Sequence, residues 1–205
     1  MKMKKITLAI TGASGAQYGF RLLQVLLEQG CEVHLLISAA ARQVCALEMS
    51  LNLPDNDKAM LDYLAKKFQC DTACLHLYSE RQWAAPVASG SNAPDAMVVC
   101  PCSSGTLSAI ATGASDNLIE RAADVMLKEQ KKLILVHREM PLSVIHLDHQ
   151  LSLARLGVVI MPASPGFYHQ PDNIADLIDF VVARILDHLA IEHQLMQRWG
   201  ADKNV

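Results

Sequence analysis

Basic runs are scarce in this chain of 205 residues, and their scarcity argues against nucleic-acid binding. The formal net charge is −3, from 18 lysines and arginines against 21 aspartates and glutamates. The two lysine clusters, at residues 2–5 and 131–132, each stand beside an apolar run and are interpreted as solvated strand entries. Nucleic-acid binding needs a basic patch that neutralises phosphates, so no such partner is expected.

Long apolar runs are also absent. Spanning a bilayer takes about 20 consecutive apolar residues, and no run here approaches that length. The N-terminal segment is basic, but its apolar run, Ile6–Ile10, is too short for the core of a signal peptide, and no cleavage site follows it. We therefore expect a cytoplasmic protein without a membrane span.

The six cysteines lack the spacing of a structural metal site. A tetrahedral zinc site needs two close pairs such as C-x-x-C. Here two cysteines flank a proline, two are four residues apart and two stand alone: Cys100 and Cys102, Cys70 and Cys74, and Cys31 and Cys45. We expect reduced, mostly buried thiols and no bound metal.

Short apolar runs alternate with amphipathic segments along the chain. The runs lack polar alternation, which is typical of parallel strands covered on both faces. The predicted strands are Ile6–Ile10, Val33–Ile37, Ala96–Cys100, Leu133–Val136 and Val158–Met161. Helical spacing predicts a first helix that contains Tyr18 and closes at Gly30, and others at Ala39–Met49, Lys58–Phe68, Ile119–Lys128, Ser143–Leu156 and Ile174–Leu189.

This alternation predicts βαβ units and an α/β fold class. The expected architecture is a Rossmann-like three-layer αβα arrangement with a mostly parallel sheet, in a single domain over residues 1–205. The C-terminal helix and tail, about 174–205, are expected to pack on this domain or on a neighbouring subunit. Residues 50–94 are the least regular part. Ligand sites of such sheets lie at the carboxyl ends of the strands.

The loop after the first predicted strand reads TGASGA (11–16). Gly12 and Gly15 permit a tight turn and a close approach of the backbone, and the following helix offers N–H groups to an anion. The loop is not G-x-G-x-x-G, and the second strand ends at Ser38 rather than at the acidic residue that holds an NAD ribose. A dinucleotide is therefore disfavoured, and a mononucleotide with its phosphate near Ser38 remains open.

Polar residues follow three other predicted strands. A second candidate phosphate cradle opens a helix after residue 102, although a capping serine would explain the same pattern. A charged pair follows the strand at 133–136, and an aromatic loop between prolines follows the last strand. These residues are Ser103, Ser104, Gly105 and Thr106 for the cradle, Arg138 and Glu139 for the pair, and Phe167, Tyr168 and His169 for the loop.

Together these segments resemble the UbiX/Pad-type flavin prenyltransferases, within the wider group of homo-oligomeric flavin-containing cysteine decarboxylase folds. They occur in order across nearly the whole chain. The resemblance implies an enzyme that joins a dimethylallyl group to reduced FMN and closes a fourth ring. The matching segments are TGASGAQYG (11–19), ASGS (88–91), CPCSSGTL (100–107), ERAADVMLKE (120–129), REMPL (138–142) and PGFYHQP (165–171), followed by Arg184 and the Arg-Trp pair at 198–199.

The resemblance implies roles around the flavin. Gly12, Ala13 and Ser14 would lie near the isoalloxazine, and Ser38 with residues 103–106 would hold the ribityl phosphate. Arg138 would help place the flavin. The loop around Trp83, Ser89, Gly90 and Ser91 would cover the ring.

The resemblance also implies how dimethylallyl monophosphate is bound. Arg121, Lys128, Tyr168 and Arg184 would bind its phosphate, and Trp199 would add a wall beside the allylic cation. Arg121 and Lys128 lie two turns apart on one helix face. Arg184 interrupts an apolar stretch, which is costly unless an anion pairs with it.

The catalytic proton transfers are assigned by the same resemblance. Glu139 with Ser14 would take the proton from N5, and Glu48 would belong to the proton network of the phosphate. Lys128 would stabilise the leaving phosphate, so no metal is required. The expected assembly is a dodecamer built from trimers with shared active sites, and its product would pass to a UbiD-type decarboxylase.

Two alternatives stay open at the level of sequence. One is an FMN-dependent decarboxylase of the same fold, which would use a histidine early in the chain, whereas His34 lies inside a predicted strand. The other is a non-catalytic FMN carrier, which would not need Lys128, Tyr168 and Arg184. The remaining histidines, among them His137, His146, His149 and His169, are interpreted as surface or loop residues. Whether the product serves ubiquinone formation or the breakdown of aromatic acids is also open.

Overall fold

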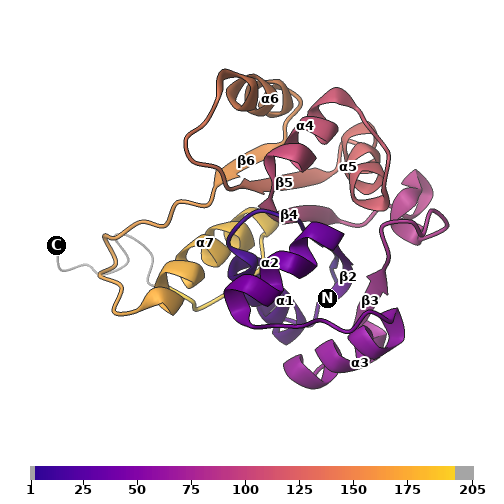
Figure 1. Cartoon of the computed structure of the whole chain (residues 1–205), viewed down its shortest axis with the longest axis vertical. Coiled ribbons are helices and arrows are strands. Elements are labelled where there is room, and N and C mark those ends of the chain that lie inside the picture. Colours follow the sequence, from indigo (N-terminus) through magenta and orange to yellow (C-terminus); the bar gives the residue numbers. More distant parts are fainter. Residues whose placement is uncertain (1–2, 197–205) are drawn as a thin grey trace.

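A six-stranded parallel sheet forms the centre of the protein in a computed structural model that describes residues 3–196. The strand order is β3-β2-β1-β4-β5-β6, and every neighbouring pair is parallel (Figure 1). The strands are β1 (Lys5–Ile10), β2 (Glu32–Ile37), β3 (Leu75–Tyr78), β4 (Ala96–Cys102), β5 (Lys132–His137) and β6 (Val159–Pro162). The predicted α/β fold with a parallel sheet is confirmed.

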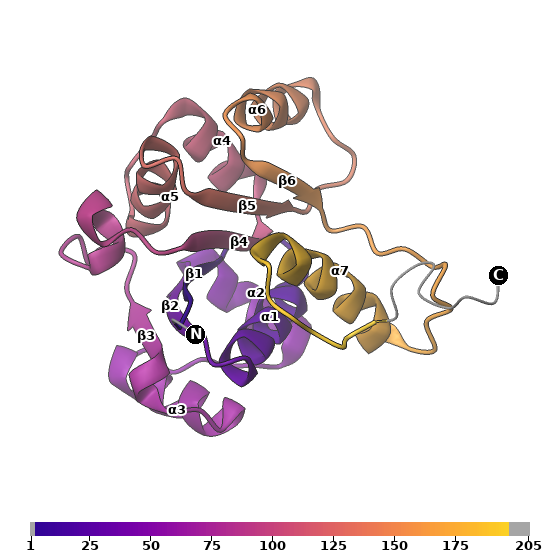
Figure 2. The same cartoon turned by 180° about the vertical axis from the view of Figure 1, so that it is seen from behind.

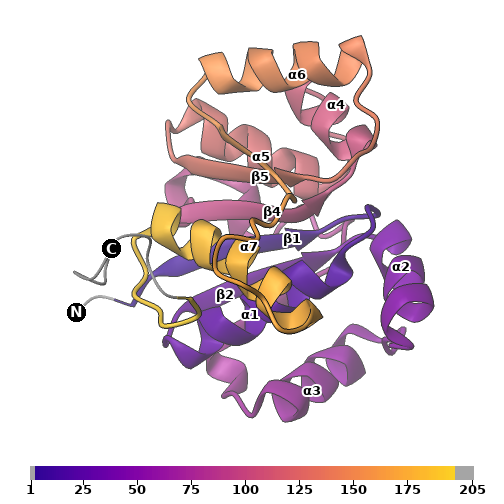
Figure 3. The ribbon, with the colours of Figure 1, turned by 90° about the vertical axis from the view of Figure 1, so that its left-hand side faces the viewer.

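Helices cover both faces of the sheet, and Figures 2 and 3 show the three layers from behind and from the side. Alternate strand residues separate the core into two clusters: Leu8 faces one and Ala9 faces the other. The first face carries α1 (Ala16–Glu28), α2 (Ala39–Met49), α3 (Asp57–Phe68) and α7 (Ile174–Leu189), and the second carries α4 (Ser104–Thr112), α5 (Leu118–Lys128) and α6 (Val144–Arg155).

The five predicted strands and the predicted helices are confirmed, with shifts of one or two residues at most ends. Strand β3 was not predicted. It has four residues, lies at the sheet edge and buries only Leu75, so it carries too little apolar pattern to be recognised. Within residues 50–94, expected to be the least regular part, the segment after Trp83 contains two short 3₁₀ turns, Pro86–Ala88 and Gly90–Asn92.

The cysteines are unpaired thiols, as expected. Cys31, Cys45, Cys100 and Cys102 are buried, and the other two are half-buried. Burial, followed by the nearby Glu48 carboxylate, raises the pKa of Cys45 to about 11, so this thiol stays protonated near neutral pH.

The buried Thr11 connects the ends of β1 and β4. Its backbone N–H and its hydroxyl both donate to the carbonyl oxygen of Pro101, at 3.2 and 2.8 Å. The same hydroxyl accepts from the backbone N–H of Ser103 at 2.8 Å. The loop after β1 and the start of α4 are therefore held together by one side chain that the sequence had marked only as part of a motif.

We expect Thr11→Val to destabilise the fold by about 1–3 kcal/mol, because it leaves the half-buried Ser103 N–H without its acceptor. Thr7→Val is the matched control on the same face of β1. Thr7 is fully buried, and its hydroxyl has no hydrogen-bond partner in the described chain, so its replacement should be neutral or stabilising. Thermal unfolding measures both. Equal melting temperatures for the two variants would contradict the role given to Thr11.

Candidate active site

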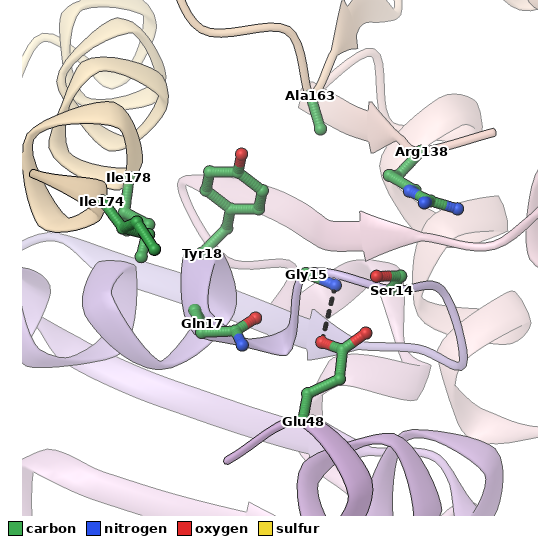
Figure 4. A pocket seen from close by; sticks show the side chains of 9 residues that line it. All are labelled: Ser14, Gly15, Gln17, Tyr18, Glu48, Arg138, Ala163, Ile174 and Ile178. Carbon is green, nitrogen blue, oxygen red and sulfur yellow. Dashed lines mark hydrogen bonds between the residues drawn. The ribbon is translucent and has the colours of Figure 1, made fainter. Parts of the chain in front are cut away.

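The strand order reverses between β1 and β4, which is where a parallel sheet opens a crevice at its carboxyl edge. A cleft of about 290 Å³ lies at this edge, built from the segments that follow β1, β5 and β6 together with the starts of α1 and α7 and the end of α2 (Figure 4). Its lining residues are Ser14, Gly15, Gln17, Tyr18, Glu48, Arg138, Ala163, Ile174 and Ile178.

The turn that carries Ser14 into this cleft depends on two glycines for different reasons. Gly15 has a φ of 101°, in the left-handed region that favours glycine. A Cβ on Gly12 would stand 2.5 Å from the Cβ of Ala40, so the close approach at this position is made by the start of α2. The tight turn is confirmed. Gly12 must be a glycine because the side chain of Ala40, and not a bound ligand, occupies the space beside it. The neighbouring Ala13 is buried.

Glu48 satisfies the N-terminus of α1. Helix α1 begins after Gly15, which offers no side chain as a cap. The Glu48 carboxylate takes that place and accepts from the backbone N–H groups of Gly15 and Ala16, at 2.9 and 3.4 Å (Figure 4). The expectation that α1 offers these N–H groups freely to an anion is therefore wrong, because a carboxylate of the chain already binds them.

The opposite side of the cleft combines a cation with a flat apolar wall. Arg138 and Tyr18 both line the cleft. Ile174 and Ile178 of α7 lie on the side of the tyrosine that is away from Arg138 (Figure 4). Burial and the nearby Cys100 raise the pKa of Tyr18, opposed by Arg138, so its hydroxyl is neutral and can donate. Such a surface suits a planar ring with polar edges.

The serines predicted to hold a phosphate begin helices. Ser38 Oγ accepts from the N–H of Ala41 at 3.0 Å, and Ser103 Oγ accepts from the N–H of Thr106 at 3.3 Å. The hydroxyls of Ser103 and Thr106 also lie 3.0 Å apart. The capping interpretation, left open from the sequence, is what the structure shows. Gly105 follows in the exposed first turn of α4.

Glu139 accepts two hydrogen bonds at the end of β5. Ser104 Oγ donates to its Oε2 at 2.7 Å, and the backbone N–H of Met140 donates to Oε1 at 3.2 Å. These bonds, the serine first, hold the pKa of the Glu139 carboxyl below its usual range. Ser104, predicted to face a phosphate, is thus bound to the proposed general base.

His137 lies at the carboxyl end of β5 and is only 3% exposed, so its interpretation as a surface residue is wrong. Its Nε2 lies 3.1 Å from Ser104 Oγ and its Nδ1 lies 2.8 Å from Gln150 Nε2. Burial, and next the neighbouring His146, lower the pKa of His137. No pattern in the sequence indicates this burial, since a histidine at the end of a strand is equally consistent with a solvated loop.

Arg121 and Lys128 lie along α5 beside the 88–91 segment, on one side of the helix as predicted. Arg121 Nε donates to the carbonyl of Ala88 at 3.1 Å, and its Nη1 pairs with Asp124 at 2.7 Å. Lys128 pairs with Glu129, and a Cβ on Gly90 would stand 2.7 Å from Lys128 Nζ. The 88–91 segment, in which the hydroxyls of Ser89 and Ser91 lie 2.9 Å apart, therefore packs against α5. It does not line the cleft around Ser14, and neither does the half-exposed Trp83.

Tyr168 and Arg184 lie on the other face of the sheet. Tyr168 is half exposed and packs edge-on against Phe180 of α7, with ring centroids 5.5 Å apart. Arg184 points outward from α7 and pairs with Asp187 at 2.6 Å. The idea that its guanidinium interrupts an apolar stretch is wrong, because the apolar face of α7 turns away from it. Trp199 lies outside the described residues.

The sheet therefore divides the predicted phosphate ligands into two groups. Lys128 and Arg121 belong to the layer of α5, and Arg184 and Tyr168 belong to the layer of α7. One protomer does not bring the two groups together.

The comparisons with known proteins agree with this architecture. A family model described as Flavoprotein matches residues 1–186. The flavin prenyltransferase UbiX of Pseudomonas aeruginosa is 56% identical over 197 residues, which cover 96% of this chain and 94% of that protein. This chain belongs to the flavin prenyltransferase family. The expected resemblance is thereby confirmed.

Solved structures of the family superpose on nearly the whole chain. AnUbiX, in complex with FMN and dimethylallyl pyrophosphate, has a TM-score of 0.85 and 39% identity, over 98% of this chain and 100% of that one. A dodecameric FMN-dependent UbiX-like decarboxylase from Escherichia coli O157:H7 has a TM-score of 0.83 and 41% identity, over 96% and 100%. The name decarboxylase is the older description of the same family.

We expect Glu48→Ala to lower the stability of the protein by about 1 kcal/mol, the usual cost of a lost helix cap. FMN affinity should fall with it, because the turn around Ser14 loses its anchor. Glu48→Gln is the control, since its amide oxygen can still accept from Gly15. Thermal unfolding and quenching of flavin fluorescence measure both properties. A Glu48→Gln protein that is stable and binds FMN but is inactive would instead support a role in the proton network.

Proposed function

We propose that this chain is a flavin prenyltransferase that joins the dimethylallyl group of dimethylallyl monophosphate to N5 and C6 of reduced FMN. The observation that carries the proposal is the cleft at the reversal of strand order, where Ser14, Tyr18 and Arg138 meet. Family membership at 56% identity supports the same reaction.

The residues of the cleft fit FMN. The aromatic face of Tyr18 and the side chains of α7 suit the isoalloxazine ring, and Gly12, Ala13 and Ser14 would lie beside it. Ser38 and the 103–106 segment would hold the phosphate from the starts of α2 and α4, where the helix dipoles favour an anion. Arg138 would bind the polar edge of the flavin. Reduced FMN, once bound, supplies the nucleophilic positions of the reaction.

The phosphate of the prenyl substrate would be bound by Lys128, Arg121, Tyr168 and Arg184. Each of the three cations already pairs with a nearby carboxylate in the chain: Asp124, Glu129 and Asp187. Exposed pairs of this kind contribute little, so a phosphate that gains charge as the allylic C–O bond breaks can replace or share them. With these donors present, the reaction needs no metal.

Proton transfer would belong to Glu139 together with Ser14. The Glu139 carboxyl is ionised near neutral pH, as a base requires, because the bonds from Ser104 and Met140 lower its pKa. Glu48 is assigned to the phosphate's proton network by resemblance, in addition to the cap that it forms on α1. Trp199 is retained as an added wall by resemblance alone.

A homo-oligomer with shared active sites would bring the two groups of phosphate ligands together. Helix α6 buries only Leu153 in the described chain, and other apolar residues on the helix and next to its ends are exposed. They include Met140, Val144, Ile145, Leu147, Leu151 and Leu156. Burial of such a surface drives association. A dodecamer, like the Escherichia coli relative, is the proposed assembly, with residues 174–205 packed on their own domain or on a neighbour.

The product is proposed to serve as the cofactor of a UbiD-type decarboxylase, and the reaction to take place in the cytoplasm. Six unpaired cysteines are in keeping with a reducing compartment. No helix in residues 3–196 is long and apolar enough to cross a bilayer.

A decarboxylase that uses an early histidine is not favoured by the described site. His34 is buried within β2, where its ring stacks on Tyr78 and its Nε2 lies 3.3 Å from Glu32. It does not line the cleft that contains Ser14.

We expect the protein, mixed with reduced FMN and dimethylallyl monophosphate, to release a flavin heavier by one dimethylallyl group, detected by mass spectrometry. The reaction should proceed in the presence of a chelator. FMN should bind far more tightly than NAD, because no acidic side chain closes β2. Tight FMN binding with an unchanged flavin mass would indicate a carrier instead.

We expect Lys128→Ala and Arg184→Ala each to lower the rate about 10²- to 10³-fold while FMN stays bound. Assembled together in one oligomer, the two variants should restore about a quarter of the shared sites, because the residues come from different subunits. The control is a mixture of separately assembled oligomers, which should stay inactive. No restoration in the co-assembled protein would argue against shared sites.

A further inference from the structure

A chain of three hydrogen bonds runs from α6 to the proposed base. Gln150 Nε2 lies 2.8 Å from His137 Nδ1, and His137 Nε2 lies 3.1 Å from Ser104 Oγ. Ser104 Oγ donates to Glu139 Oε2 at 2.7 Å. The chain links α6, the end of β5 and the first turn of α4, and α4 and α6 also pack against each other.

The donors of this series of hydrogen bonds all point the same way, from Gln150 toward Glu139. An amide nitrogen only donates, so His137 Nδ1 must accept from Gln150. A neutral imidazole then carries its proton on Nε2, which donates to Ser104. The hydroxyl hydrogen of Ser104 is left for Glu139. Burial lowers the pKa of His137 and keeps the ring neutral, so the donor at Nε2 persists near neutral pH.

We propose that His137 and Ser104 are positioning residues that aim the carboxylate of Glu139 for proton transfer. Glu139 is otherwise an exposed side chain with several accessible rotamers, and ordering it costs entropy. The bond from Ser104 holds one of its oxygens and the N–H of Met140 holds the other. The inference rests on the proposed function only for the proton that Glu139 receives.

The same hydrogen bonds also lower the pKa of the Glu139 carboxyl. Glu139 faces Ser104 of α4, His137 of β5 and His146 of α6, and all three lower its pKa. His137 in turn faces His146, which lowers its pKa, and Glu139, which raises it. A hydrogen bond to the charged form favours that form, so removing the Ser104 hydroxyl must raise the pKa of the Glu139 carboxyl.

Ser104→Ala tests the last link of the chain. The titration of Glu139 is followed by infrared spectroscopy on flavin-free protein labelled with ¹³C-glutamate, as the difference from Glu139→Gln. We expect the Glu139 carboxyl of Ser104→Ala to titrate at higher pH than in the unmodified protein. A base works only above its pKa, so the acid limb of the prenylation rate should move to higher pH by the same amount, and the maximal rate should fall about ten-fold.

Ser108→Ala is the matched control, since it removes a hydroxyl one turn further along α4. It should leave both the titration and the rate profile unchanged. If Glu139 titrates alike in the two serine variants, the proposal is overturned, whatever the activity. A loss of FMN affinity in Ser104→Ala with an unchanged titration would overturn it too, and would place Ser104 in the phosphate cradle.

His137→Gln and His137→Leu test the middle link. A glutamine can place an amide N–H near the position of Nε2, so it should keep most of the Glu139 titration and of the rate, whereas leucine should reproduce the effect of Ser104→Ala. Equal behaviour of the two variants at similar melting temperature would reduce His137 to a packing residue. The infrared result needs no turnover, so absence of a prenylated product would count against the proposed function alone.

Discussion

The hydroxyl of Thr11 is the contact on which the geometry of this site depends most. Parallel strands place all their following loops at one edge, but they do not fix those loops relative to one another. Thr11 does so, because its hydroxyl bonds to the carbonyl of Pro101 and to the N–H of Ser103. The turn that carries Ser14 and the helix that carries Ser104 are therefore joined through one side chain.

The sheet places the cleft residues together at one edge, but it separates the residues proposed to bind the prenyl phosphate. Lys128 and Arg184 lie on opposite sides of the sheet. No change of side-chain rotamer can bring them together, because the packed core lies between them. The proposed use of both residues on one phosphate therefore requires a second copy of the chain. In that proposal the exposed apolar surface around α6 would serve catalysis as well, since association and substrate binding would depend on each other.

The sequence predicted most of the fold and part of the site. Strands such as β1 and β5 were found because both of their faces are buried, and β3 was missed because an edge strand of four residues has almost no pattern. Glycine turns and cap serines are local and could be read directly. The partners of Glu48 and His137 could not, because Gly15 lies 33 positions from Glu48 and Ser104 lies 33 positions from His137.

The polar groups at the strand ends already have partners within the chain, and this constrains how a ligand can bind. A serine hydroxyl has two acceptor sites and one donor, and capping a helix uses one acceptor. Ser38 accepts from Ala41 and thus keeps its hydrogen for a phosphate oxygen. Ser104 gives its hydroxyl hydrogen to Glu139, so that hydroxyl is not a donor to the phosphate that the 103–106 segment is proposed to hold. The two serines, one the cap of α2 and the other the first residue of α4, are therefore suited to different tasks: the first to binding an anion, the second to orienting a base.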